Sequence, residues 1–188
     1  MIVKNTIKSA SQILKKNYIE SYLLDAELIL SNIMNVKKEF LLLNDELHVS
    51  KKIMKKYNVA INRRAKKEPV AYIIGKKEFW SIDFPVNKTT LIPRPETELL
   101  VNEVVKYYKN KKINILDIGT GSGCILLSIL KELNLSRGIG IDVSARAIQI
   151  AKANSEKLNL SCRSKFRVFD IDEFNMGKYD LVISNPPY

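Results

Sequence analysis

Residues 113–123 constrain the fold of this chain more than any other stretch. They read Ile-Asn-Ile-Leu-Asp-Ile-Gly-Thr-Gly-Ser-Gly, an apolar strand pattern that runs into three alternate glycines. An apolar run at 124–133 follows at once and is typical of a helix. Alternate glycines let the backbone turn sharply and let a ligand approach where a Cβ atom would collide, and the helix start offers free N–H groups. The sequence therefore predicts a strand, a tight turn and a helix N-terminus that can hold a nucleotide-like ligand.

Strands and helices alternate from this turn onward, and this pattern predicts the α/β class. Alternation of this kind specifies a parallel sheet with right-handed crossovers. In such sheets, ligands bind beyond the carboxyl ends of the strands. We expect strands at 113–118, 138–142, 166–169 and 179–184, and helices at 124–133 and 145–158.

An acidic residue, Asp142, ends the second of these strands, 19 residues beyond Gly123. A carboxylate at this place can accept both ribose hydroxyls of an adenosine held by the turn. The same argument holds for NAD, so the spacing does not separate the two cofactors. In the dinucleotide pattern Gly-x-Gly-x-x-Gly the third glycine would stand at Cys124, which we instead interpret as a small residue packed under the turn. A Gly-x-Gly-x-Gly turn after an acid, here Asp117, is the S-adenosylmethionine pattern.

The last expected strand leads into Asn185, Pro186, Pro187 and Tyr188. Proline has no N–H and a fixed φ, and it holds the preceding residue extended, so the stretch presents a stiff row of carbonyls beside the asparagine amide. Carbonyl oxygens can accept both N–H bonds of a planar NH2 group, and the tyrosine ring can lie against that plane. Such a nitrogen is a weak nucleophile, so aiming its lone pair at a sulfonium methyl group is catalysis by orientation and electrostatics. The motif predicts methyl transfer to a planar amino group.

The part of the chain before the glycine turn divides by pattern into helices and a hairpin. Apolar residues recur at helical spacing in the first 68 residues, with Ser21 and Ser50 as expected N-caps and Pro69 as a stop. Residues 78–91 instead place aromatic and β-branched residues around a turn at Pro85 and Asn87, which predicts a β-hairpin. The expected organisation is a helical domain at 1–75 with a short helix at 37–43, a hairpin linker at 76–95, and an α/β domain at 96–188 that begins with a helix at 96–106.

Composition and charge narrow the class of protein. With 46% hydrophobic residues and no apolar run near the roughly 20 that a membrane span needs, we expect a soluble, cytoplasmic chain. Two distant cysteines, Cys124 and Cys162, indicate neither a disulfide framework nor a metal site. Of the net charge of +11, residues 1–75 carry +7, with 14 basic against 7 acidic residues.

Eight basic residues lie on one expected helix, at 51–67, with no acid between them. Such a face could meet RNA or an acidic protein surface. No aromatic or glycine-rich nucleic-acid module accompanies the charge, so we favour a solvated face and expect no direct nucleic-acid binding.

Four segments of the chain form a recognisable set: Glu-Pro-Val-Ala-Tyr-Ile-Ile-Gly at 68–75, Leu-Ile-Pro-Arg-Pro-Glu-Thr-Glu at 91–98, Leu-Asp-Ile-Gly-Thr-Gly-Ser-Gly at 116–123, and Asn-Pro-Pro-Tyr at 185–188. Together they resemble the peptide chain release factor glutamine methyltransferases. The Asn-Pro-Pro-Tyr motif is shared with adenine-N6 DNA and guanine-N2 RNA methyltransferases, so it does not separate these families. The two segments before the cofactor turn are more specific.

The resemblance implies a Rossmann-like methyltransferase domain that uses S-adenosylmethionine, and a helical domain that recognises a class I release factor. The methyl group would go to the side-chain nitrogen of the glutamine in a Gly-Gly-Gln loop, in the cytoplasm, by a monomer when full length. Asn185 would bind the glutamine amide and also count among the cofactor-binding residues, with Pro186, Pro187 and Tyr188 completing the clamp. The other implied site residues are Gly119, Thr120, Gly121, Ser122 and Gly123 for the methionine portion, Asp142 for the ribose, Ile171 with Asp170 for the adenine, and Arg94 and Glu96 at the entrance.

The family's sheet has seven strands, whereas four are expected here, so the resemblance implies a domain that lacks its C-terminal strands. The strand at 179–184 would then lie at an open sheet edge, and the clamp would stand at a chain end that frays. We accordingly expect a fragment with little turnover. Two alternatives stay open, an adenine-N6 or guanine-N2 nucleic-acid methyltransferase and an inactive fragment that only binds.

Overall fold

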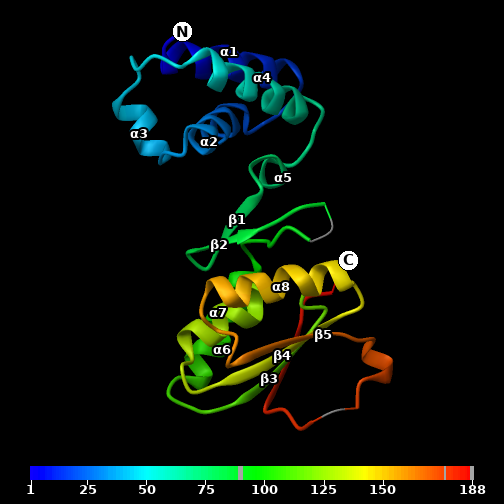
Figure 1. Ribbon diagram of the computed structural model, residues 1–188. Coiled ribbons are helices and arrows are strands. Elements are labelled where there is room, and N and C mark those ends of the chain that lie inside the picture. The colour runs from blue at the N-terminus through cyan, green and yellow to red at the C-terminus, as the bar shows by residue number, and fades with distance from the viewer. Residues whose placement is uncertain (89–90, 176, 187–188) are drawn as a thin grey trace. The chain divides into compact units, whose positions relative to one another are not determined.

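A computed structural model describes residues 1–88, 91–175 and 177–186 of the chain (Figure 1). Contacts divide it into two compact units, a helical unit at Met1–Gly75 and a sheet unit at Lys76–Tyr188. Each unit has its own cluster of buried apolar side chains. Within the described ranges, no helix combines the length and apolar content that a membrane crossing needs.

The helical unit is built from amphipathic helices that bury one face each. Leu14, Ile29 and Leu30 are completely buried and lie on the first two helices. Tyr57 is buried among them, and its hydroxyl donates to the Ala26 carbonyl at 3.0 Å, while burial raises its pKa. The five helices are α1 (Val3–Lys16), α2 (Tyr22–Met34), α3 (Lys38–Leu43), α4 (Lys51–Ala65) and α5 (Val70–Ile74).

The helix ends of this unit confirm one expected cap and correct another. Ser50 caps α4, because its side chain accepts from the Ile53 N–H at 3.3 Å. Ser21 precedes α2 but makes no cap bond, since its hydroxyl donates to the Asp25 carboxylate at 2.8 Å instead. The short helix α5, which the sequence pattern missed, begins directly after Pro69.

One ion pair joins α2 to α4 inside the helical unit. Arg64 Nε lies 2.6 Å from Asp25 Oδ2, and the two side chains are 17% and 7% exposed. Arg64 also donates to the Glu68 carbonyl at 3.1 Å. The neighbouring pair of Arg63 with Glu68 is also short, at 2.6 Å, but the Arg63 side chain is 44% exposed. Removing one partner of a buried pair leaves an uncompensated charge, which costs far more than losing an exposed pair.

The sheet unit contains a separate hairpin and a four-stranded parallel sheet. The sheet order is β5-β4-β3-β6, with every neighbouring pair parallel, which confirms the α/β expectation. The expected strands and helices all form, with ends shifted by up to two residues. The elements are β1 (Lys76–Phe79), β2 (Ile82–Pro85), α6 (Thr97–Tyr108), β3 (Asn114–Ile118), α7 (Cys124–Glu132), β4 (Arg137–Asp142), α8 (Ala145–Lys157), β5 (Ser164–Val168), the 3-10 turn η1 (Ile171–Glu173) and β6 (Leu181–Ser184).

Helices α6, α7 and α8 lie on one side of this sheet, as Figure 1 shows. Inward side chains of three strands, Ile115, Phe166 and Ile183, pack there against the buried faces of the helices. On the opposite face Val182 is 55% exposed. The helical layer therefore fixes which strand residues point toward the core and which point away from it.

The hairpin turns earlier than the sequence pattern predicted. Its two turn residues are Trp80 and Ser81, both with positive φ (53° and 55°), and Pro85 merely ends β2. A two-residue turn with both φ values positive matches the twist of a hairpin, although Trp is unusual there. Glu98 and Glu132 hold this turn, accepting from the Trp80 backbone N–H and indole N–H, both at 2.9 Å. Phe79, Ile82 and Phe84 belong to the core of the sheet unit, so the hairpin packs with that unit.

We expect Arg64→Met to destabilise the helical unit by about 3 kcal/mol, because it leaves the buried Asp25 carboxylate without its cationic partner. Arg63→Met, one residue away, should cost less than about 1 kcal/mol. Urea unfolding followed by helical circular dichroism measures both changes, while Trp80 fluorescence reports the sheet unit separately. Equal losses in the free energy of unfolding would show that the buried Arg64–Asp25 pair contributes no more to stability than the exposed Arg63–Glu68 pair.

Candidate active site

The glycine turn between β3 and α7 has the geometry of a ligand cradle. Gly119, Gly121 and Gly123 all have positive φ (68°, 56° and 77°), which L side chains rarely adopt. A Cβ atom on Gly119 would meet nothing within 4 Å, and one on Gly121 would meet only a backbone oxygen at 4.0 Å. Gly123 faces the core, because its Cβ would come within 3.1 Å of the Phe166 ring. The first two glycines therefore border open space that a ligand can enter, and the third closes the turn onto the core.

Hydrogen bonds from three elements hold this turn in place. The Thr120 N–H donates to the Ile141 carbonyl of β4 at 2.9 Å. The Thr120 hydroxyl donates to Asp117 at 2.6 Å. From α8, the buried Asn154 amide donates to the Ser122 carbonyl at 2.8 Å. The turn is thus fixed before any ligand arrives, as an orienting site requires.

Asp142 ends β4 and reaches the same turn. Its Oδ2 accepts from the Gly121 N–H at 2.9 Å, and its Oδ1 accepts from the Ser144 N–H at 2.8 Å. The residue is half-buried, and each carboxylate oxygen keeps a second lone pair for another donor. A carboxylate with free acceptor capacity beside an open glycine turn fits the ribose and amino groups of S-adenosylmethionine.

Asp117 lies directly below the turn and is only 1% exposed. Its Oδ2 accepts from Thr120, whereas Oδ1 has no hydrogen-bond partner among the described residues. Burial raises the pKa of the carboxyl group to about 7, the hydrogen bond from Thr120 opposes this rise, and the nearby Asp142 charge adds to it. An unsatisfied buried oxygen at this place fits a site whose ligand carries positive charge.

The thiol of Cys124 packs beneath the turn as a small side chain. It is 9% exposed, and burial raises its pKa to about 12, although hydrogen bonding from Ser122 works in the other direction. A thiol with so high a pKa is almost entirely protonated at neutral pH and is a poor nucleophile. Its surroundings therefore give no support to a reactive cysteine at this helix start.

Asn185 follows β6, the strand that pairs with β3 on the side away from β4. Ser184, the last residue of β6, donates through its hydroxyl to the Ile118 carbonyl at 3.0 Å, which holds the two strand ends together. The Asn185 side chain is half-buried, and its Nδ2 donates to Thr97 Oγ1 at 3.1 Å. Pro186 is exposed. The expected clamp residues Pro187 and Tyr188 lie outside the described residues.

The remaining expected site residues occupy the same end of the sheet or the segment before α6. Asp170 follows β5 and caps η1 by accepting from the Asp172 N–H at 3.1 Å. Ile171 begins η1 and is 44% exposed, so its side chain is accessible to a ligand. Arg94 and Glu96 precede α6 and are exposed.

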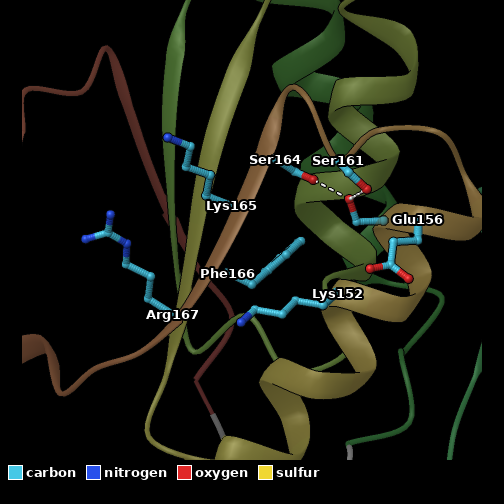
Figure 2. A pocket seen from close by; sticks show the side chains of 8 residues that line it. Lys152, Glu156, Ser161, Ser164, Lys165, Phe166 and Arg167 are labelled. Atoms are coloured by element: carbon cyan, nitrogen blue, oxygen red, sulfur yellow. Dashed lines mark hydrogen bonds between the residues drawn. The ribbon is translucent and has the colours of Figure 1, made fainter.

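A separate pocket of about 390 Å³ lies between α8 and the edge strand β5, and none of the three turn glycines lines it (Figure 2). Its hydroxyl groups bind one another, with Ser155 Oγ at 2.6 Å from Ser164 Oγ and 3.4 Å from Ser161 Oγ. Figure 2 shows Lys165 and Arg167 pointing away from these serines. The polar groups do not converge on a common point, so the chemistry favours the glycine turn over this pocket.

Sequence reasoning missed two residues that the structure brings to the site, Thr97 and Asn154. Asn154 falls on the buried face of α8, at helical spacing from Ala147, Ile148 and Ala151, and a polar residue at such a position is a recognisable signal. Thr97 lies inside the resembling segment at 91–98, but nothing in the local pattern connects it to a residue 88 positions later.

Two family profiles match the chain, "PrmC N-terminal domain" at residues 5–75 and "Methyltransferase domain" at residues 109–187. The chain is similar to a "Release factor glutamine methyltransferase" of Buchnera aphidicola, with 40% identity over 93% of this chain and 63% of the relative. A protein of the same name from Clostridium acetobutylicum is 39% identical over 100% of this chain and 67% of the relative.

The chain thus spans 63% and 67% of these two relatives. Among solved structures, it is similar to an RNA methyltransferase from Salinibacter ruber, with 20% identity and a TM-score of 0.44 over 50% of this chain and 60% of that one.

Asp117 should make the stability of the sheet unit depend on pH. Folding raises its pKa from 3.8 to about 7, so the folded state binds more protons in this range and stability falls as pH rises from about 4 to 7. The slope is at most about 1.4 kcal/mol per pH unit. Urea unfolding followed by Trp80 fluorescence should show this decline in the unmodified chain and not in Asp117→Asn, with pH 4 as the common reference. Parallel curves from pH 4 to 8 would refute the assignment.

Proposed function

We propose, since this chain belongs to the release factor glutamine methyltransferase family, that it serves the methylation of the side-chain nitrogen of a glutamine in class I peptide chain release factors. The observation that carries the proposal is that the glycine turn and Asn185 follow neighbouring parallel strands, β3 and β6. The bond from Ser184 to the Ile118 carbonyl joins the two strand ends. A cofactor cradle thus lies beside a side chain able to bind a planar amide.

S-adenosylmethionine, when bound, supplies an electrophilic methyl group on a sulfonium. Gly119 and Gly121 leave the open space for its methionine portion, and Asp142 offers carboxylate oxygens for its ribose. Thr120, Ser122 and Gly123 shape the turn, while Asp170 and Ile171 offer a surface for the adenine. The residues named here include two carboxylates and no basic side chain, which suits a cofactor with positive charge near its reacting atom.

Asn185 is the residue that would orient the substrate. Its side-chain carbonyl oxygen can accept an N–H of the glutamine amide, and the carbonyl groups of the Asn-Pro-Pro stretch can accept the other. Pro186 keeps this backbone extended, and Pro187 and Tyr188 are proposed to complete the clamp. The methyl transfer needs no strong base, because positioning the nitrogen lone pair supplies most of the rate acceleration.

The helical unit is the proposed docking site for the release factor, in a cytoplasmic protein that acts as a monomer when full length. One observation favours a nucleic-acid substrate instead. Lys51, Lys52, Lys55 and Lys56 lie in the first turns of α4 and are all accessible to solvent. An amino-group methyltransferase acting on RNA or DNA would use such a face against phosphates.

Asp142→Ala should weaken S-adenosylmethionine binding by about one to two decades, because it removes charge-assisted hydrogen bonds worth about 1.5 to 3 kcal/mol. Gly121→Val should also weaken it, since a β-branched residue resists a φ of 56° and fills the open space beside the turn. Glu156→Ala, which removes a carboxylate from the pocket of Figure 2, is the matched control and should leave the affinity within about twofold. Calorimetric titration that finds the affinity of both site variants unchanged would rule out the glycine turn as the cofactor site.

The substrate class is tested by offering a radioactive methyl donor with purified unmethylated release factor, ribosomal RNA and DNA in parallel. We expect label to enter the release factor at a low rate, on a glutamine side chain. Asn185→Ala should lower the transfer rate far more than it lowers release factor binding, because the protein interface is large and the amide clamp small. Label in nucleic acid alone would make the amino-group alternative correct, and near-normal turnover by the variant would exclude Asn185 as the orienting group.

A further inference from the structure

We propose that Thr97 is a positioning residue, which holds the Asn185 side chain in one rotamer for methyl transfer. The inference rests on the proposed function and concerns the same site. Thr97 is the first residue of α6, and its Oγ1 accepts a hydrogen bond from Asn185 Nδ2 at 3.1 Å.

The two ends of an asparagine amide have almost the same shape, so packing alone does not decide which end faces a ligand. A half-turn about the last side-chain bond exchanges the acceptor Oδ1 with the donor Nδ2. In the structure Nδ2 faces α6 and donates to Thr97 Oγ1. Because a threonine hydroxyl can donate as well as accept, this bond fixes the rotamer of the side chain and not, by itself, which end of the amide faces the substrate. Oδ1 then points to the other side and has no partner among the described residues.

This orientation is the one that a substrate amide needs. The NH2 group of a glutamine is a donor, so Asn185 must present Oδ1 and not Nδ2 to it. The reversed amide would set two donors against each other and turn the nitrogen lone pair away from the methyl group. In the transfer the glutamine nitrogen forms a bond to the methyl carbon, the C–S bond breaks with its electron pair on sulfur, and one N–H proton leaves to water. Thr97 takes no part in these bond changes.

Thr97 stands on a rigid support. Its own N–H donates to the Arg94 carbonyl at 3.0 Å, and the next residue, Glu98, accepts from the Trp80 N–H at 2.9 Å. Further along α6, Val101 and Val104 are buried in the core of the sheet unit. A β-branched side chain also has few χ1 rotamers, so the hydroxyl position is well defined. Groups that orient a reactant must be held by such supports.

The contact also connects two of the segments that resemble the family. Thr97 belongs to the stretch at 91–98, and Asn185 begins the Asn-Pro-Pro-Tyr stretch. The hydrogen bond spans 88 positions of the chain. The stretch at 91–98 thereby gains a role in holding Asn185, through the Thr97 hydroxyl.

The test compares Thr97→Val, which keeps the shape but loses the hydroxyl, with Thr97→Ser, which keeps the hydroxyl. Without the bond, the side chain can occupy up to three χ1 rotamers, so we expect kcat to fall roughly threefold in Thr97→Val. KM for S-adenosylmethionine should stay within about twofold, because the cofactor cradle does not include Thr97. Thr97→Ser should restore kcat to within about twofold of the unmodified chain.

A second readout follows the side-chain amide itself. In ¹⁵N–¹H NMR spectra, the pair of signals from the Asn185 side-chain NH2 group is assigned by its loss in Asn185→Ala. The chemical shifts of this pair should move toward those of a solvent-exposed amide in Thr97→Val and stay unchanged in Thr97→Ser. Unchanged kcat or an unmoved Nδ2 signal in Thr97→Val would overturn the inference. If the unmodified chain transfers no methyl group to release factor, the proposed function fails, while the NMR comparison still decides whether Thr97 orients Asn185.

Discussion

The parallel pairing of β3 with both β4 and β6 is the constraint on which the site depends. Ile118, the last residue of β3, lies opposite Ile141 on one side and Ser184 on the other. Because parallel strands end at the same edge, the residues that follow them become neighbours. The glycine turn, Asp142 and Asn185 therefore lie at the same edge of the sheet although they are far apart in the chain. A shift in the pairing of either strand would separate the proposed cofactor cradle from the proposed amide clamp.

The turn itself is rigid because buried polar groups surround it. Thr120 and Asn154 satisfy their side-chain hydrogen bonds inside the protein, and each such bond contributes about 1 kcal/mol. Asp117 is the exception, since one of its oxygens lacks a described partner and its pKa is raised to about 7 by burial. A carboxyl group in this environment destabilises the fold and suits a cationic ligand. Stability and ligand binding thus make opposite demands on one residue.

Local patterns predicted elements more reliably than they predicted ends and turns. The helices of the helical unit follow from apolar spacing, and Ser50 caps α4 as expected. Ser21 does not cap α2, because the buried Asp25, already paired with Arg64, competes for its hydroxyl. The hairpin turn was misplaced for a similar reason. Trp80 accepts an unusual φ because Glu98 and Glu132 bind it, and both partners lie in later helices.

The amino-acid sequence by itself determined the α/β class, the glycine turn and the family, because alternate glycines, strand periodicity and short motifs are local properties of the chain. Only the tertiary structure decided which side chains support the site. Asn154 reaches the turn from α8, Asp117 loses its solvent, and Thr97 meets Asn185 across 88 positions. These contacts arise when the helical layer closes on the sheet, and their energies come from burial and hydrogen bonding between elements, which no local pattern encodes.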